Sequence, residues 1–300
     1  MLCFASMMPL ACAGEPQIPA TVADGAKPVE VYAASIWFEG PTWDKVTKKL
    51  YFTAYFKKDK KPVTQILRLD EPGKVTVWMD NAKDINGTCL GQDGRLYGAQ
   101  NDTHSIVSMK IGKDGPEDFK VVYENQKLNQ PNDVRQAPNG DLYFTDPEFK
   151  IHKSGVYHLT LDGKATQIVT EMPAPNGISI SLDGKTLYVS DSFEKLWRSY
   201  PINQDGTVGA GKVLFKPENA PQKDPDGMTI DENGNLYCTG CGGLWVVSPE
   251  GKELGLVPFT ELTSNCCFGG EDGKTLFITC GNKVYSLQMK VRGALFKDNK

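Results

Sequence analysis

The sequence has little histidine, no excess of positive charge and almost no long apolar run. It contains 3 histidines in 300 residues and carries a formal net charge of -4. A histidine-rich metal site is therefore not expected, and neither is a surface for nucleic acid or an anionic membrane. Beyond the N-terminus, no apolar run approaches the roughly 20 residues of a membrane-spanning helix. These absences predict a globular chain that binds neither nucleic acid nor the membrane interior.

The N-terminus departs from this pattern. The stretch MLCFASMMPLACAGEPQ is apolar and has small residues at 11–13 that resemble a signal-peptide cleavage site, but no Lys or Arg precedes Lys27. We therefore expect residues 1–28 to be a leader for a periplasmic or secreted protein, or else the tail of a cytoplasmic one. Residues 29–300 are expected to form a single domain.

The cysteines do not form a zinc-binding pattern. Cys238 and Cys241 form a C-T-G-C pair, but the sequence has no second C-x-x-C. Ordinary packing is the expected role of these two side chains. A disulfide through Cys241 stays open if the protein is exported.

What the sequence does contain is an internal repeat of about 45 residues. Six windows share one pattern: FEGPTWDKVTKKLYFTA (38–54), INGTCLGQDGRLYGAQ (85–100), PNDVRQAPNGDLYFTD (131–146), APNGISISLDGKTLYVSDS (174–192), PDGMTIDENGNLYCTG (225–240) and SNCCFGGEDGKTLFITC (264–280). An aromatic residue recurs in their second halves, at Tyr51, Tyr97, Tyr143, Tyr188, Tyr237 and Phe277. The spacings are 46, 46, 45, 49 and 40 residues, which indicates repeated structural units.

Each window is typical of a β-hairpin. Five of them place Asp-Gly or Asn-Gly between two strand-like runs, which is the strongest short-range signal for a tight hairpin turn. The first window has DKVTKK there and needs a longer turn. Two further strand candidates follow the hairpin, for example at 155–161 and 165–171. Four strands per unit, repeated six times, predict an all-β fold: a six-bladed β-propeller with four-stranded antiparallel blades.

The two ends of the chain are expected to close the ring. The last unit shows three clear strands, whereas VEVYAAS at 29–35 precedes the first window without a partner. We expect this N-terminal strand to complete the sixth blade and cover its exposed edge.

A polar residue stands where the inner strand of each unit begins. These residues are Glu39, Asn86, Asn132, Asn176, Asp226 and Asn265, and each precedes its aromatic by 11 or 12 residues. In a propeller these positions would form a ring at one mouth of the channel. Two carboxylates and four amides without a neighbouring Lys or Arg are costly to desolvate unless a cation neutralises them.

An all-oxygen set of this kind suits a hard cation. Ca²⁺ is the expected ion, with Mg²⁺, Mn²⁺ or Zn²⁺ as alternatives, although the three histidines miss the ring. Each Asn or Asp alone is also an ordinary turn residue. A metal is therefore expected from the six ring residues taken together, of which Asn86 and Asn265 are the weaker members.

The motifs E-G-P, P-N-D, P-N-G and P-D-G, with GDLYFTDP and NCCFGGEDGKTLFIT, resemble the SMP-30/gluconolactonase/LRE family and diisopropyl-fluorophosphatase-like propellers. The resemblance covers about 29–287. It implies a divalent metal held by Glu39, Asn132, Asn176 and Asp226, and hydrolysis of lactones or organophosphates. In such a site the metal polarises the substrate oxygen. Asp226 is then the expected base or nucleophile.

The sequence departs from the family pattern at one candidate substrate contact. Many sugar-lactone members of the family have Arg before P-N-D, whereas this chain has Gln130, an amide without the charge or the fork of donors. Gln130, Asn132 and Asp146 are the candidate substrate-binding residues, and Asp146 could instead accept backbone hydrogen bonds that hold an inner loop. Loops at the mouth, such as 54–63, are expected to set selectivity.

Three functions remain open from the sequence. The first is a calcium-dependent, gluconolactonase-like hydrolase that acts on a small lactone or ester. The second is phosphotriester hydrolysis on the same metal. The third is a propeller that binds calcium, a ligand or a protein without turnover, because a fold alone does not fix a function.

Overall fold

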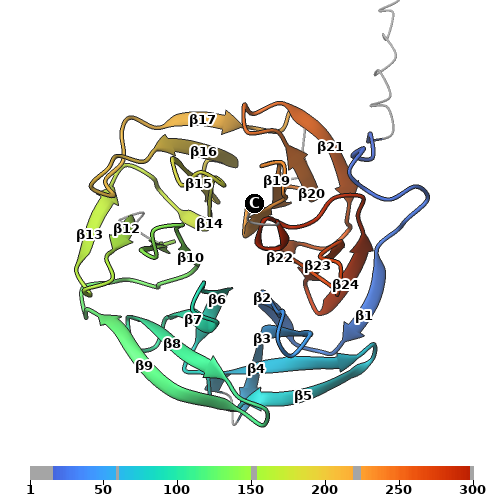
Figure 1. The fold of residues 1–300 in the computed structure, drawn as a ribbon, viewed down its shortest axis with the longest axis horizontal. Coiled ribbons are helices and arrows are strands. Elements are labelled where there is room, and N and C mark those ends of the chain that lie inside the picture. Colours follow the sequence, from blue (N-terminus) through green and yellow to red (C-terminus); the bar gives the residue numbers. More distant parts are fainter. Residues whose placement is uncertain (1–15, 59–60, 150–153, 219–223, 298–300) are drawn as a thin grey trace, which may run out of the picture.

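A computed structural model describes residues 16–58, 61–149, 154–218 and 224–297. It contains six four-stranded antiparallel sheets arranged as blades around a central channel (Figure 1). The expected six-bladed β-propeller is therefore confirmed. The only helix among the described residues is a short 3₁₀ turn, η1 (Ala294–Phe296), and none there is long and apolar enough to cross a bilayer.

The first five blades are each continuous in the chain and begin with the innermost strand, whereas the sixth takes its outermost strand from the N-terminal part of the chain. In chain order the strands are β1 (Val29–Ala33), β2 (Trp37–Asp44), β3 (Lys49–Lys58), β4 (Lys61–Glu71), β5 (Lys74–Met79), β6 (Ile85–Leu90), β7 (Arg95–Gln100), β8 (Ser105–Ile111), β9 (Pro116–Glu124), β10 (Val134–Gln136), β11 (Leu142–Asp146), β12 (Gly155–Leu159), β13 (Ala165–Val169), β14 (Pro175–Ile180), β15 (Thr186–Asp191), β16 (Leu196–Pro201), β17 (Lys212–Phe215), β18 (Met228–Ile230), β19 (Leu236–Gly240), β20 (Gly243–Val247), β21 (Glu253–Pro258), β22 (Thr263–Gly269), β23 (Thr275–Cys280) and β24 (Lys283–Gln288).

The N-terminal strand closes the ring. β1 pairs antiparallel with β24, so the sixth blade has the order β1-β24-β23-β22. Residues upstream of β1 also pack on the propeller: Val22 is buried in the core between the fifth and sixth blades and bridges to Met289. The folded body therefore begins before the expected boundary at Val29. The proposed cleavage site at 11–13 lies outside the described residues.

The recurring aromatic residues pack in the core between the blades. Six clusters of buried apolar side chains lie between neighbouring blades, and each cluster contains one of the six aromatics. Between the first and second blades, for example, Tyr51 packs with Trp78 and Leu96. Each aromatic thus joins its own blade to a neighbour, which explains why the repeat retains it.

The hairpin turns follow the expected chemistry, including the exception. The Gly94, Gly140, Gly184, Gly234 and Gly273 residues of the Asp-Gly and Asn-Gly turns all have positive φ. The first hairpin has no glycine there. Instead the Asp44 carboxylate accepts hydrogen bonds from the backbone N–H groups of Val46 and Thr47, and Lys48 adopts φ 54°. An Asx-type turn replaces the glycine turn.

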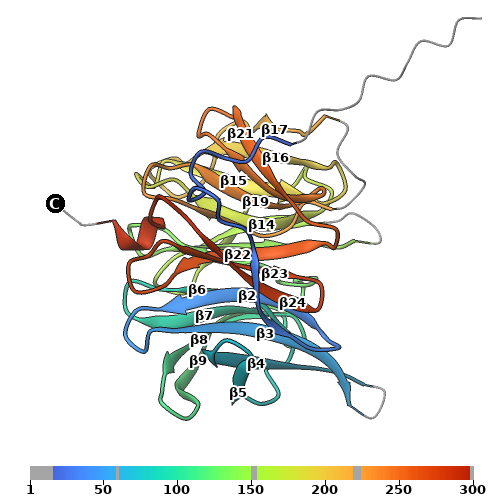
Figure 2. The same ribbon diagram turned by 90° about the vertical axis from the view of Figure 1, so that its right-hand side faces the viewer.

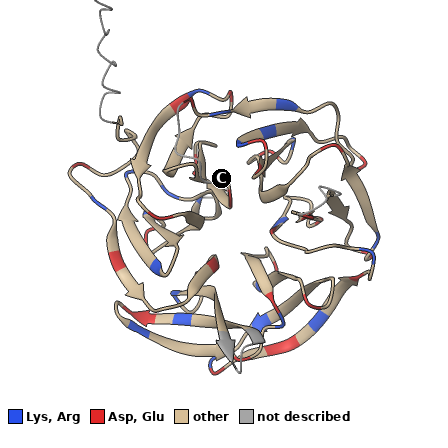
Figure 3. Ribbon diagram, turned by 180° about the vertical axis from the view of Figure 1, so that it is seen from behind, with Lys and Arg blue, Asp and Glu red and all other residues tan. Residues whose placement is uncertain are grey.

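The segment 54–63 is mainly a hairpin and not a loop. β3 extends to Lys58 and β4 starts at Lys61, so the two strands pair almost to their tips (Figure 2). Residues 59–60 lie outside the described residues. Alternating side chains of high strand propensity, such as Tyr55 and Val63, explain why the ladder continues. Elsewhere basic and acidic residues are interspersed around the outer strands (Figure 3).

Closure by β1 gives a testable stability difference. Val31 is 8% exposed and packs with Phe38 and Phe52, whereas Val29 on the same strand is 59% exposed. Val31→Asp should lower the free energy of unfolding by about 3 kcal/mol or more, because it buries a carboxylate in an apolar cluster. Val29→Asp is the matched control and should change it by less than about 0.5 kcal/mol. Urea denaturation measures both, and equal losses would contradict the closure role of β1.

Candidate metal centre and active site

The six inner strands bring the expected polar ring together. β2, β6, β10, β14, β18 and β22 contact one another around the channel axis. Glu39, Asn86, Asn176 and Asn265 lie within these strands, whereas Asn132 and Asp226 lie two residues before β10 and β18. The ring positions therefore occupy equivalent places in the six blades, as the spacing predicted.

Asn176 has a buried oxygen without a partner. Its side chain is 7% exposed, and its Nδ2 donates to Ser192 Oγ at 3.1 Å. Ser192 Oγ in turn donates to the Pro225 carbonyl oxygen at 2.7 Å, which fixes the direction of the hydroxyl. Asn176 Oδ1 has no hydrogen-bond partner. A buried acceptor without a donor costs roughly 1–3 kcal/mol, so this oxygen points to a ligand such as a cation.

Two ring carboxylates carry strongly shifted pKa values. Burial, and then the nearby charge of Asp133, raises the pKa of Glu39 to about 8. Asp226 is half-buried, and desolvation, followed by the charges of Glu39 and Asp133, raises its pKa well above the ordinary value. Like charges held together in a desolvated site resist ionisation. A divalent cation would reverse this by stabilising the ionised forms.

Asp133 is a third acidic residue that the repeat pattern did not single out as part of the site. It is 1% exposed, and Asn265 Nδ2 lies 3.2 and 3.4 Å from its two carboxylate oxygens. Asn265 therefore hydrogen-bonds to Asp133 from across the channel. Most other ring residues are followed by glycine, because a side chain there would meet the next blade; a Cβ at Gly177 would lie 2.2 Å from the Asp226 carbonyl oxygen. Asp133 breaks this rule, and that was the available signal.

A set of hydroxyl groups holds the backbone of the ring. Thr53 Oγ1 donates to the Asn86 carbonyl oxygen at 3.0 Å, Thr145 Oγ1 to that of Asn176 at 2.6 Å and Ser190 Oγ to that of Asp226 at 2.9 Å. Each donor lies two residues after its recurring aromatic, on the second strand of the preceding blade. The repeat pattern did not single out these residues, although a Thr or Ser two residues after the aromatic recurs in the sequence. They tie Asn86, Asn176 and Asp226 to the blade before each of them.

Asp146 supports the segment that carries Gln130. The side chain of Asp146 is 0% exposed, and its carboxylate accepts the backbone N–H groups of Asn129 and Gln130, each at 2.8 Å to Oδ1. Of the two roles expected from the sequence, this geometry favours the supporting one. Burial raises the pKa of Asp146 to about 6. The side chains of Gln130 and Asn132 are half-buried at the mouth, and their contact with substrate stays a prediction.

Trp37 and Tyr55 form one wall above Glu39. They are paired on β2 and β3, two residues beyond the pair Glu39 and Thr53, so the Trp37 side chain lies on the same face of the blade as Glu39. Trp37 is 37% exposed, and the Tyr55 hydroxyl donates to the Ile85 carbonyl oxygen at 3.3 Å. Nothing in the repeat identified this wall, because the other windows have no aromatic pair at this level.

The donor set fits a hard cation through its oxygens. The described residues contain no group of three or more His, Cys, Asp or Glu side chains placed to hold a metal, so a site here must use amides as well. The unpartnered Asn176 Oδ1, with the carboxylates of Glu39 and Asp226 and the amide of Asn132, supplies such a mixed set. Oxygen-only donors of this kind suit Ca²⁺ or Mg²⁺.

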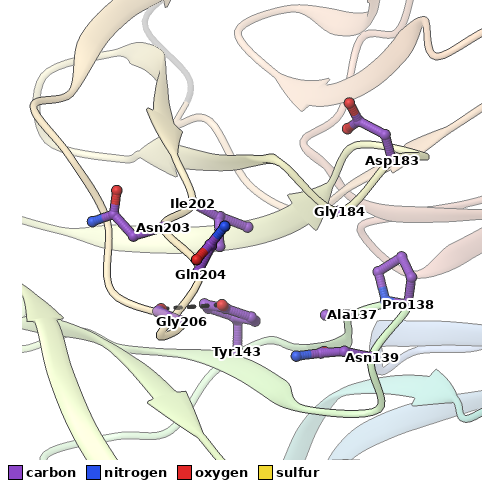
Figure 4. A pocket seen from close by; sticks show the side chains of 10 residues that line it. All are labelled: Ala137, Pro138, Asn139, Tyr143, Asp183, Gly184, Ile202, Asn203, Gln204 and Gly206. Carbon is purple, nitrogen blue, oxygen red and sulfur yellow. Dashed lines mark hydrogen bonds between the residues drawn. The ribbon is translucent and has the colours of Figure 1, made fainter.

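A separate pocket lies at the opposite end of the blades. It has a volume of about 180 Å³ and is lined by turn residues of the third and fourth blades, including Asn139, Asp183 and Asn203 (Figure 4). Tyr143 donates a hydrogen bond to the Gly206 carbonyl oxygen there. Because these hairpin turns are remote from the start of the inner strands, this pocket is not part of the ring.

Residues 37–282 match the SMP-30/Gluconolactonase/LRE-like region. The chain belongs to this family. A gluconolactonase from Zymomonas mobilis is 32% identical, over 91% of this chain and 84% of the relative. Regucalcin from Sus scrofa is 26% identical, over 86% of this chain and 89% of the relative. A solved gluconolactonase structure from Xanthomonas campestris has a TM-score of 0.78 and 26% identity, covering 91% of this chain and 94% of that one.

Membership of the SMP-30/gluconolactonase/LRE-like family confirms the resemblance that the E-G-P, P-N-D, P-N-G and P-D-G motifs indicated. All four motifs fall inside the matched range. The roles of Glu39, Asn132, Asn176 and Asp226 as ligands, and of Asp226 as a reacting group, remain predictions at the level of individual residues.

The raised pKa of Glu39 predicts the pH dependence of stability in the absence of divalent cations. Since the folded-state pKa of about 8 lies above the unfolded value of 4.5, the folded state binds more protons between these limits. The free energy of unfolding should therefore fall as pH rises from about 5 to 8. Glu39→Gln should flatten this slope, and calcium added at pH 8 should restore stability to the parent. Denaturation in chelator across this pH range measures it, and an equal slope in both proteins would contradict the assignment.

Proposed function

We propose that this chain is a calcium-dependent lactonase that hydrolyses small cyclic esters at the channel mouth. The observation that carries the proposal is the unpartnered Asn176 Oδ1, which lies in a ring with two desolvated carboxylates. Relatives named gluconolactonase, in sequence and in structure, support lactones as the substrate class. A structural neighbour named as a calcium-binding regucalcin shares the fold.

Glu39, Asn132, Asn176 and Asp226 would hold the cation through their oxygens. When bound, a divalent cation polarises the ester carbonyl and stabilises the negative charge that develops on its oxygen. Ser192 keeps the Asn176 amide in the orientation that leaves Oδ1 available. The hydroxyls of Thr145 and Ser190 hold the backbone on which Asn176 and Asp226 are carried.

Asp226 is the proposed reacting group. The residue is half-buried, and its carboxylate can accept a proton from an attacking water or attack the carbonyl carbon itself. In either role it must be ionised, and its raised pKa works against this without a counter-charge. With a cation bound, Asp226 would be held in its ionised form.

Gln130 and Asn132 are the proposed substrate contacts, and Asp146 fixes the backbone at Gln130. Gln130 offers a neutral amide where a guanidinium would offer a charge and several donors. Trp37 adds an exposed aromatic surface beside Glu39. This combination favours lactones with few hydroxyl groups over polyhydroxylated sugar lactones.

We also infer that the protein is exported. The support is the apolar start of the sequence, with small residues at 11–13. Residues 1–15 lie outside the described residues, so this inference rests on sequence alone.

Activity on a substrate panel tests the proposal. The parent should hydrolyse aliphatic or sugar lactones, lose activity in chelator and regain it with Ca²⁺. Asp226→Asn should lower kcat by about 100-fold or more, since an amide cannot take the proton. Initial rates on aldonolactones, aliphatic lactones and fluorophosphates give the measurement.

Asp183→Asn, in a turn at the other end of the blades, is the matched control and should leave the rates unchanged. Hydrolysis of fluorophosphates alone would favour the phosphotriester alternative. Activity that survives exhaustive chelation would overturn the metal, and binding of calcium without turnover on the whole panel would overturn the enzyme.

Gln130→Arg tests the role of position 130. A guanidinium adds charged donors for substrate hydroxyls, and a hydrogen bond to a charged group contributes roughly 1.5–3 kcal/mol. The variant should therefore lower KM for aldonolactones by about tenfold while leaving KM for unsubstituted lactones within about twofold. Steady-state kinetics on one lactone of each kind measures this. An equal change on both would place position 130 outside the substrate site.

A further inference from the structure

The channel beneath the ring contains one basic residue. Inner-strand residues from the ring down to the level of the recurring aromatics are mostly Gly, Asn, Thr, Ser and Cys. The charged residues in these described segments (39–42, 86–89, 132–135, 176–179, 226–229 and 265–267) are Glu39, Asp133, Asp226 and Arg135. Three carboxylates and one guanidinium leave two negative charges when all are ionised.

Arg135 reaches across the channel. It lies on β10 opposite Tyr143, three residues after Asn132. Its guanidinium donates to the carbonyl oxygen of Thr88 on β6 and to that of Met228 on β18, both at 3.0 Å. A third bond, also 3.0 Å, goes to the Val134 carbonyl oxygen in its own strand. One side chain therefore joins the second, third and fifth blades just below the ring.

The charge of Arg135 acts on the acidic groups above it. Burial raises the pKa of Asp133, and the largest opposing influence is Arg135. Arg135 also opposes the burial-raised pKa of two thiols at its own level, Cys89 in the neighbouring second blade and Cys267 across the channel in the sixth. A guanidinium stays protonated at every pH at which the protein is folded. Its bonds to carbonyl oxygens do not neutralise it, so the channel keeps a permanent positive charge.

We propose that Arg135 is the counter-charge that sets the cation affinity of the ring. By leaving two negative charges in the channel, it matches the site to one divalent ion and disfavours ions of higher charge. Its three carbonyl bonds hold the guanidinium at a fixed depth below the ring. This inference rests on the proposed function, because it requires a cation at the ring.

Removal of the charge should therefore strengthen cation binding, an effect that a merely structural role would not produce. Arg135→Met or Arg135→Gln leaves three negative charges around the ring. Because the repulsion scales with the charge of the ion, the gain in binding free energy for Tb³⁺ should be about 1.5 times that for Ca²⁺. We expect the Kd for Ca²⁺ to fall about tenfold and the Kd for Tb³⁺ about 30-fold.

Calorimetric titration of the full chain with CaCl₂ and with TbCl₃ tests this. Arg135→Gln retains a donor for the carbonyl oxygens if Arg135→Met fails to fold. Arg135→Lys keeps the charge without the fork and should stay within about threefold of the parent for both ions. Arg68→Met removes an arginine that is paired with Asp70 away from the channel, and it should leave both Kd values unchanged.

The outcomes separate the two proposals. A parent that binds no Ca²⁺ overturns the cation of the proposed function, and this inference with it. A parent that binds Ca²⁺, with neutral variants that bind both ions no more tightly than Arg135→Lys, overturns the counter-charge alone. Equal gains for Ca²⁺ and Tb³⁺ in the neutral variants would also overturn it.

Discussion

The structure depends on closure of the ring. A four-stranded blade has two faces, and it can bury them only against the blades on either side. The six apolar clusters lie between neighbouring blades, and the one that joins the sixth blade to the first forms only when the two ends of the ring meet. The pairing of β1 with β24 secures that meeting, because strands from both ends of the chain then share one sheet. The position of every inner strand, and hence of the ring, follows from this closure.

The ring shows how a near-symmetric scaffold becomes an asymmetric site. Six equivalent positions would give six equivalent side chains, but only two are acidic and one of the amides is occupied by Asp133. The hydroxyl that recurs after the aromatics is missing in the second blade, where Ala99 takes its place. There the Gly87 N–H donates to the Asn132 carbonyl oxygen at 2.7 Å. The scaffold thus tolerates local exchanges as long as each ring residue stays tied to a neighbour.

Much of this was predictable because it is periodic. The spacing of the aromatics fixed the number of blades, the Asn-Gly and Asp-Gly pairs located the hairpins, and the offset of 11 or 12 residues identified the ring. What the sequence could not provide was contact across the channel. The other repeats have no acidic residue at the position of Asp133 and no basic residue at that of Arg135, so periodicity does not identify these two side chains. The fold extended beyond the predicted boundary because Val22 packs through tertiary contact without any repeat signal.

Ring closure by β1 also has a consequence for the order of events during synthesis. Among the strands, β1 is synthesised first and its partner β24 last. The two strands therefore cannot pair until β24 has been made, and the apolar face of the first blade stays uncovered until then. Glu39 belongs to the first blade, which is made early, and Asp226 to the fifth, which is made late. Glu39 and Asp226 can therefore come close to each other only after the later blades have joined the first.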